Sequence, residues 1–162
     1  MIDLISICSF NAAYAMAIDS DNLEQWPNFF TVDAVYRITN IDNVKDNLPA
    51  GIVYADSRDM LEDRIAALRL ANIYERQRYR HILGIPNILS QSEASTEANT
   101  PFNVTRIMAT GQMDVFATGY YQDIFVKAKG SNSAVSSNQI LLAQRVVVCD
   151  STVTDTLLAL PL

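Results

Sequence analysis

Residues 102–129 read FNVTRIMATGQMDVFATGYYQDIFVKAK, and this stretch decides the fold. Two strand-like segments, Phe102–Thr110 and Met113–Lys129, lie on either side of Thr110-Gly111-Gln112. A short polar segment with a central glycine is typical of a hairpin turn between two strands. We therefore expect two antiparallel strands that pair with each other.

Further strands extend from this hairpin in both directions along the chain. Tyr79–Leu89 and Ile140–Asp150 are rich in β-branched and aromatic residues, and Asp33–Ile41 alternates apolar with polar side chains. Two segments rich in Ser, Asn and Ala, Ser90–Thr100 and Gly130–Asn138, are expected to form surface loops. The second half of the chain is therefore predicted to be a strand meander.

Helical patterns dominate the first half. Apolar residues at helical spacing predict a helix over Ile2–Ile18, and a short second helix is expected from Asp21 to Pro27. A third helix, capped by Asp56 or Ser57, is predicted to run to about Tyr74.

Helices followed by a strand meander predict an α+β fold. We expect a strongly curved antiparallel sheet that forms a cone, with the helices packed on its concave side. The mouth of such a cone either holds a ligand or fills with side chains. No repeat or internal boundary divides the chain, so residues 1–162 are predicted to form a single domain.

Composition and charge exclude several classes of partner. The chain is 49% apolar with a net charge of -6, which argues against nucleic acid or an anionic membrane as a partner. No apolar run is long enough to span a bilayer, and no signal peptide is recognisable, so we expect a cytoplasmic protein. Cys8 and Cys149 are expected to be reduced, buried thiols.

The inventory of side chains excludes most metal and nucleotide sites. The sequence has one histidine and two cysteines, which are too few for a two-histidine iron site, a Rieske centre or a Cys/His zinc site. The five glycines never approach a nucleotide-binding spacing, and no nucleophile elbow occurs. We predict no catalytic, cofactor-binding or metal-binding residue in this chain.

His81 is the one residue from which an enzyme hypothesis can start. In a strand, His81 shares a face with Tyr79 and Leu83, and pairing with Asp33 or Asp123 would make it a general base inside the cone. The alternative, which we favour, is a buried structural histidine whose nitrogens are satisfied by neighbouring groups.

Arginines and an apolar tail are the candidates for contacts with other subunits. Arg76, Arg78 and Arg80 alternate along a strand and are suited to dock carboxylates of a partner, although a solvated, salt-bridged edge is equally compatible. The C-terminal stretch adds Arg145, Leu157, Leu158 and Leu160. Its apolar tail is expected to contribute both to the core and to an interface.

Several short motifs occur in an order that resembles a known family, the small (beta) subunits of aromatic-ring-hydroxylating dioxygenases. They are Leu23-x-x-Trp26-x-x-Phe29-Phe30, Asp56-x-x-x-x-Leu61-x-x-Arg64, Arg78-Tyr79-Arg80-His81, Tyr121-x-Asp123, and the ending from Arg145 to Leu162. The resemblance covers essentially the whole chain.

The resemblance implies a ketosteroid-isomerase-like (cystatin-like) curved sheet and assembly with a large alpha subunit, commonly as an α3β3 hexamer in which the beta chains form a trimer. It further implies that the alpha subunit carries a Rieske [2Fe-2S] cluster and a mononuclear Fe(II), and that the complex forms cis-dihydrodiols in aromatic catabolism. No catalytic residue is carried over to this chain.

Three hypotheses for the function follow. The first is a non-catalytic structural subunit that scaffolds iron-bearing alpha subunits. The second is a small cofactor-free isomerase or dehydratase with His81 as base, which requires an open pocket and would be excluded by a cone filled with aromatic side chains. The third is a ligand-binding module without chemistry.

Overall fold

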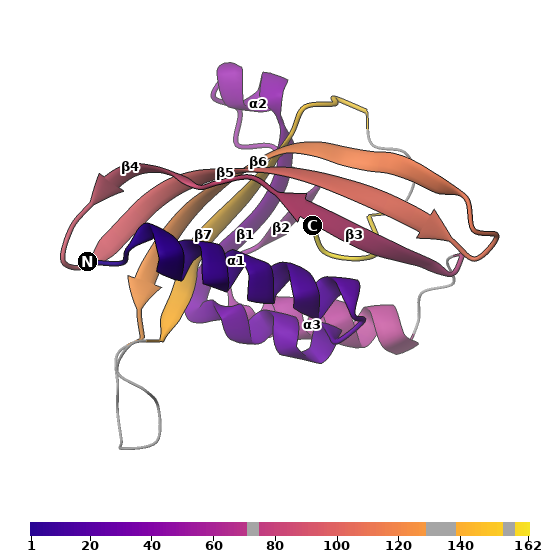
Figure 1. The fold of residues 1–162 in the computed structure, drawn as a ribbon, viewed down its shortest axis with the longest axis horizontal. Coiled ribbons are helices and arrows are strands. Elements are labelled where there is room, and N and C mark those ends of the chain that lie inside the picture. The colour runs from indigo at the N-terminus through magenta and orange to yellow at the C-terminus, as the bar shows by residue number, and fades with distance from the viewer. Residues whose placement is uncertain (71–74, 129–138, 154–157) are drawn as a thin grey trace.

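The computed structural model describes residues 1–70, 75–128, 139–153 and 158–162, and it shows a curved sheet arching over two long helices (Figure 1). The elements run in the order α1 (Leu4–Asp19), η1 (Leu23–Phe29), β1 (Phe30–Asn40), α2 (Ile41–Lys45), β2 (Val53–Ala55), α3 (Arg58–Leu70), β3 (Gln77–Leu83), β4 (Asn87–Gln91), β5 (Ser95–Met108), β6 (Met113–Lys127) and β7 (Ile140–Cys149). This arrangement confirms the predicted α+β class with helices under a curved sheet. Within the described residues, no helix is long and apolar enough to cross a membrane.

The seven-stranded sheet has the order β2-β1-β7-β6-β5-β3, with β4 pairing beside β3 on β5. The predicted hairpin is present, because β5 and β6 pair antiparallel around a turn in which Gly111 has a φ of 89°. One pairing differs from the all-antiparallel prediction: β1 and β7 run parallel. Parallel neighbours need a long crossover rather than a hairpin, and most of the chain lies between β1 and β7.

The region between residues 79 and 100 corrects two predictions. The expected strand Tyr79–Leu89 is divided into β3 and β4, and part of the expected loop Ser90–Thr100 is the first half of β5. Thr96, Ala98 and Thr100 are the buried residues of this half-strand. Because they are small or polar, the alternation that marks a half-buried strand is invisible in a count of large apolar residues.

Irregularities in the pairing bend the sheet into its cone. The register shifts between Val104 and Thr105 on β5 and between Ile124 and Phe125 on β6, and such bulges increase local twist. Beside these shifts, a Cβ at Gly119 would lie 1.9 Å from the carbonyl oxygen of Val148. Only glycine allows β6 and β7 to approach this closely.

Helices α1 and α3 lie where the sequence predicts helices; the expected second helix is the short 3-10 helix η1, and α2 was not predicted. The Asp3 side chain accepts a hydrogen bond from the Ser6 backbone N–H over 2.8 Å and caps α1. Helix α3 buries Leu61, Ile65 and Leu68 and therefore presents one apolar stripe to the core. The end that the sequence predicts for this helix, residues 71–74, lies outside the described residues. Both helices lie under the arch of the sheet (Figure 1), and the buried residues of each belong to the core.

Candidate functional site

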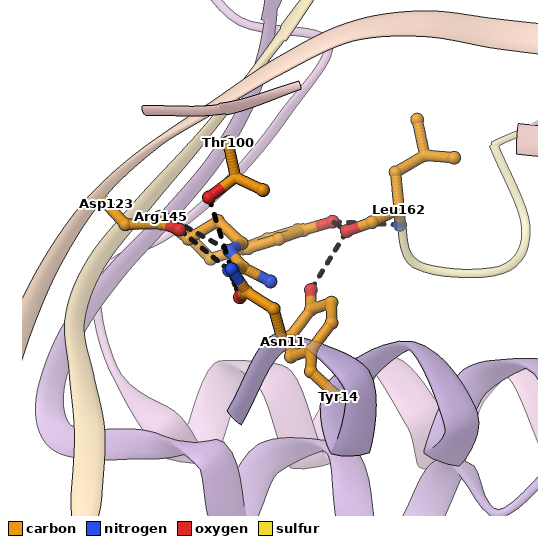
Figure 2. A network of polar contacts seen from close by, with 7 residues as sticks. Asn11, Tyr14, Thr100, Asp123, Arg145 and Leu162 are labelled. Atoms are coloured by element: carbon orange, nitrogen blue, oxygen red, sulfur yellow. Dashed lines mark hydrogen bonds and ion pairs between the residues drawn. The ribbon is translucent and has the colours of Figure 1, made fainter. Parts of the chain in front are cut away.

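A buried ion pair joins two neighbouring strands inside the cone (Figure 2). Arg145 on β7 lies directly opposite Asp123 on β6 in the antiparallel register. Arg145 Nε and Nη2 donate to the two carboxylate oxygens of Asp123, each over 2.8 Å, and both side chains are 0% exposed. Because both oxygens accept from one guanidinium, this carboxylate is engaged in structure rather than free for acid–base chemistry.

Asn11 connects this ion pair to helix α1. Its side-chain oxygen accepts from Arg145 Nη2 over 2.6 Å, and its amide nitrogen donates to Thr100 Oγ1 over 3.1 Å. One asparagine thus uses both ends of its amide to join α1 to β7 and β5. Nothing in the apolar pattern of the first helix predicted this polar contact.

Two tyrosine rings enclose the Arg145 guanidinium. Its central carbon lies 4.1 Å from the ring centre of Tyr14 and 4.0 Å from that of Tyr121, a cation–π arrangement. Burial opposes the charge on Arg145, but Asp123 and the two tyrosines outweigh it and raise the pKa of the guanidinium. Burial also raises the pKa of both phenols, so these hydroxyls are neutral at pH 7.

The tail of the chain occupies the remaining space next to these rings. Tyr14 Oη and Tyr36 Oη donate to the carbonyl oxygen of Leu162 over 2.9 and 3.1 Å. Leu158, Ala159, Leu160 and Leu162 all belong to the buried core. The C-terminus accordingly lies between the sheet and the helices (Figure 1).

Side chains therefore fill the cone. The largest fully buried residues that line it include Tyr14, Trp26, Phe30, Tyr36, Tyr121 and Phe125. Within the Trp26–Phe30 segment, Trp26, Pro27 and Phe30 are buried and contribute to this core. A substrate has no access to an interior packed in this way, and this disfavours the isomerase hypothesis.

His81 is a buried structural residue with a partner that the sequence analysis did not identify. Its Nδ1 lies 2.6 Å from Asp19 Oδ1, and its backbone N–H donates to Asp19 Oδ2 over 2.9 Å. The proposed partners were wrong, because Asp33 is exposed on β1 and Asp123 is paired with Arg145. The histidine side chain is 0% exposed, and its contacts with Asp19 join the end of α1 to β3.

The surface beside this pair has a groove of about 400 Å³ lined by residues that include Cys8, Met16 and Ile85. Asp19 and His81 are themselves among the residues that line this groove. The His81 side chain nevertheless has no exposed surface, and its Nε2 is buried without a hydrogen-bond partner among the described residues. Across the part of the chain that the structure describes, no group of three or more His, Cys, Asp or Glu residues could hold a metal ion.

The interface candidates from the sequence fall into two groups. Arg76, Arg78 and Arg80 are exposed at or just before the edge strand β3, as the alternation predicted. Arg80 also lies 3.7 Å from Asp19. Arg145, in contrast, has a side chain with no exposed surface, so its selection as an interface residue was wrong.

The remaining interface candidates lie in the C-terminal tail. The predicted burial of one cysteine was also wrong. Leu158 and Leu160 are buried within their own chain, at 8% and 5% exposure, which agrees with the core half of their predicted role. Leu157 lies outside the described residues. Both cysteines are free, but Cys8 is exposed rather than buried as expected.

Comparisons with known proteins agree with this geometry. The ring hydroxylating beta subunit family matches residues 13–148. Two relatives from Comamonas sp, the beta 1 and beta 2 subunits of the terminal oxygenase component of terephthalate 1,2-dioxygenase, are each 58% identical over 162 residues, covering 100% of this chain and 100% of their own length.

More distant relatives are also small or beta subunits of dioxygenases. The anthranilate 1,2-dioxygenase small subunit of Burkholderia cepacia is 32% identical over 149 residues, covering 92% of this chain and 88% of its own. A solved structure from Novosphingobium aromaticivorans, described as the beta subunit of an aromatic-ring-hydroxylating dioxygenase, has 33% identity and a TM-score of 0.85. This match covers 98% of this chain and 96% of the other.

Proposed function

This chain belongs to the family of ring hydroxylating beta subunits, and from that membership we propose that it scaffolds iron-bearing alpha subunits without catalysing a step itself. As a beta subunit it is part of an oxygenase complex. The observation that carries the non-catalytic role is the filled cone, in which the one histidine and the central carboxylate are both buried and paired.

The iron centres are assigned to the alpha subunit. A Rieske [2Fe-2S] cluster and a mononuclear Fe(II) together need more histidines and cysteines than the one and two that this sequence contains. The proposed complex is an α3β3 hexamer in the cytoplasm, in which three copies of this chain form a trimer.

The proposed substrate is terephthalate. Its support is the identity of 58% over the full length with the two Comamonas subunits, against 32% for the anthranilate relative. The large subunit is expected to choose the substrate, so the likeness of this chain identifies the system to which it belongs rather than a pocket of its own.

The experiment that tests this function compares the chain alone with the chain co-expressed with an alpha subunit encoded beside it. Alone, it should bind no iron and convert no aromatic acid. Together, light scattering should give the mass of three chains of each kind, and the complex with its reductase should form a cis-dihydrodiol from terephthalate. Iron in the isolated chain, or failure to join any alpha subunit, would contradict the proposal.

The exposed arginine row is the proposed contact with a partner subunit. Planar guanidinium groups bind carboxylates through two parallel hydrogen bonds, and Arg78 and Arg80 lie exposed on an edge strand. The double variant Arg78→Glu/Arg80→Glu should lower the fraction of assembled complex in size-exclusion chromatography. Lys45→Glu, which reverses an exposed charge on α2, is the matched control and should assemble normally.

A further inference from the structure

We propose that the interior of the cone is a peptide-binding site, and that residues 158–162 of this chain are its ligand, bound in cis. The site takes a short apolar peptide whose carbonyl oxygen is held by two tyrosine hydroxyls. The proposal rests on how this segment is held, which differs from how every strand of the sheet is held.

Side chains, rather than a backbone ladder, bind the segment. At one end, Arg64 Nη2 on α3 donates to the carbonyl oxygen of Leu158 over 2.7 Å. At the other end, the Leu162 carbonyl accepts from Tyr14 and Tyr36, and the Leu162 N–H donates to Tyr36 Oη over 3.2 Å. Among the described residues, no backbone–backbone hydrogen bond joins 158–162 to the rest of the chain.

This pattern is that of a bound peptide. A strand is held by its neighbours through repeated backbone pairs, whereas a docked segment has its backbone groups satisfied by side chains of the site. Three different elements, α1, β1 and α3, supply the donors here. The proline at position 161 has no N–H group, which removes one donor that the interior would otherwise have to satisfy.

The apolar side chains provide the rest of the recognition. Leu162 is 0% exposed and Leu160 is 5% exposed, and both are in the cluster that contains Trp26 and Tyr36. Burial of branched apolar side chains next to a few placed polar groups is the usual composition of a ligand site. The chain itself therefore occupies the cone, and we expect no other ligand to enter while the segment is bound.

The test cleaves the chain between the site and the proposed ligand after folding, so that the segment is not deleted. A protease recognition sequence is inserted between Thr152 and Val153, which are both exposed. The full chain folds first and is then cleaved, so residues 153–162 become a separate peptide. A brief pulse of denaturant allows exchange with a fluorescently labelled synthetic peptide of the same sequence.

The expected result is saturable binding of the labelled peptide to the cleaved chain, and a melting temperature that rises with peptide concentration. The intact chain should show neither effect. If cleavage unfolds the protein, excess peptide should restore the fold. Absence of binding, or a cleaved chain that loses the fragment and keeps its melting temperature, or an unfolded chain that the peptide does not rescue, would overturn the proposal.

Variants identify which contacts carry the recognition. A peptide with Leu162→Ala should bind about 30-fold more weakly or worse, because it leaves a cavity in a closed interior. Tyr36→Phe in the cleaved chain should weaken binding about tenfold, since it removes the partner of both Leu162 backbone groups. Tyr120→Phe, at a half-buried tyrosine on β6 next in sequence to the buried Tyr121, is the matched control and should bind normally.

Synthetic peptides that end in a carboxylate or in an amide distinguish two kinds of recognition. The Leu162 carbonyl oxygen accepts from two neutral phenols, so both peptides should bind. Binding of only the carboxylate form would contradict recognition through a neutral carbonyl oxygen, and binding of neither form would show that the cone is not a peptide site.

Discussion

Arg145 and the pair Arg78 and Arg80 are chemically the same side chain in opposite environments. Arg145 is enclosed by two aromatic rings and paired with Asp123 at 0% exposure. Arg78 and Arg80 lie exposed on the outer face of an edge strand. In the sequence, all three were candidates for the same role.

The difference teaches that the residue opposite an arginine, rather than its own neighbours in sequence, decides its role. Asp123 faces Arg145 directly across the β6–β7 pair, whereas Arg78 and Arg80 face Ile107 and Thr105 across β3–β5. A charge can stay in a protein interior only with a compensating partner. The register therefore makes one arginine part of the core and leaves the others at the surface.

The strongest test of this comparison is removal of the buried cation. Arg145→Leu leaves Asp123 buried and unpaired, and should lower the free energy of unfolding by about 3–5 kcal/mol in urea denaturation. The double variant Arg145→Leu/Asp123→Leu should recover most of this loss because no charge remains in the core. A single variant as stable as Arg78→Leu would show that the two environments do not differ.

A smaller effect is expected from the residue that connects the ion pair to the helix. Asn11→Ala removes the acceptor for Arg145 Nη2 and the donor to Thr100, and should cost about 1.5–3 kcal/mol by the same measurement. The exposed Asn28, whose side-chain amide donates to Gln25 over 3.2 Å, is the control. Equal losses for Asn11→Ala and Asn28→Ala would contradict a special role of the interior network.

A fourth arginine lies between the two extremes. Arg69 bonds to Glu24 and Asp21 over 2.8 and 2.9 Å at the surface, with its side chain 34% exposed. Solvent screens such pairs, so Arg69→Ala should cost about 0.2–1 kcal/mol, and less in high salt. A loss that persists undiminished in 1 M salt would contradict this screening.

The stabilisation by the Arg69–Glu24 pair has a defined pH dependence. The hydrogen bond from Arg69 lowers the pKa of Glu24. The stability that this pair contributes is therefore present above the unfolded-state pKa of Glu24, near 4.5, and is lost as pH falls through the lower folded-state pKa. The difference between wild type and Arg69→Ala should therefore shrink in acid. A stability difference between the two proteins that grows as the pH falls below the unfolded-state pKa of Glu24 would contradict this prediction.

The smallest effect on stability is expected at the exposed row. Arg78→Ala and Arg80→Ala should each change the free energy of unfolding by less than about 0.5 kcal/mol. Their effect belongs to assembly and not to folding. A loss above 1.5 kcal/mol in the isolated chain, on the scale of the Asn11 variant, would mean that the row supports the fold after all.

What the sequence could predict depended on how visible each pattern was. The hairpin around Gly111 and helix α3 have strong local signals, and both were located correctly. The parallel pairing of β1 with β7 has no local signal in the sequence, because it depends on which strand, distant from β1 in sequence, lies between β1 and β6 in the sheet. Val146 and Val148 are buried like Val147, so β7 shows no alternation that would have placed Arg145 on the inner face.

The polar contacts of the site were hidden for a related reason. Asp19 is the last residue of α1, an end at which the helix dipole disfavours a carboxylate, and only the tertiary fold brings it to His81. Asn11 occupies the inward face of α1 at a position where a helical pattern predicts an apolar residue. Such residues become recognisable only when the chain segments that meet them are known.

One thiol of this chain is exposed and the other is buried, so the protein can be labelled at a single site. Burial, with a further contribution from Asp150, raises the pKa of the Cys149 thiol to about 11, whereas Cys8 is exposed on α1. A maleimide spin label at neutral pH should therefore attach to Cys8 alone. With one label on each copy, the distances between labels report how identical copies are arranged. Threefold symmetry would give a single inter-label distance, and any other arrangement of three copies would give more than one.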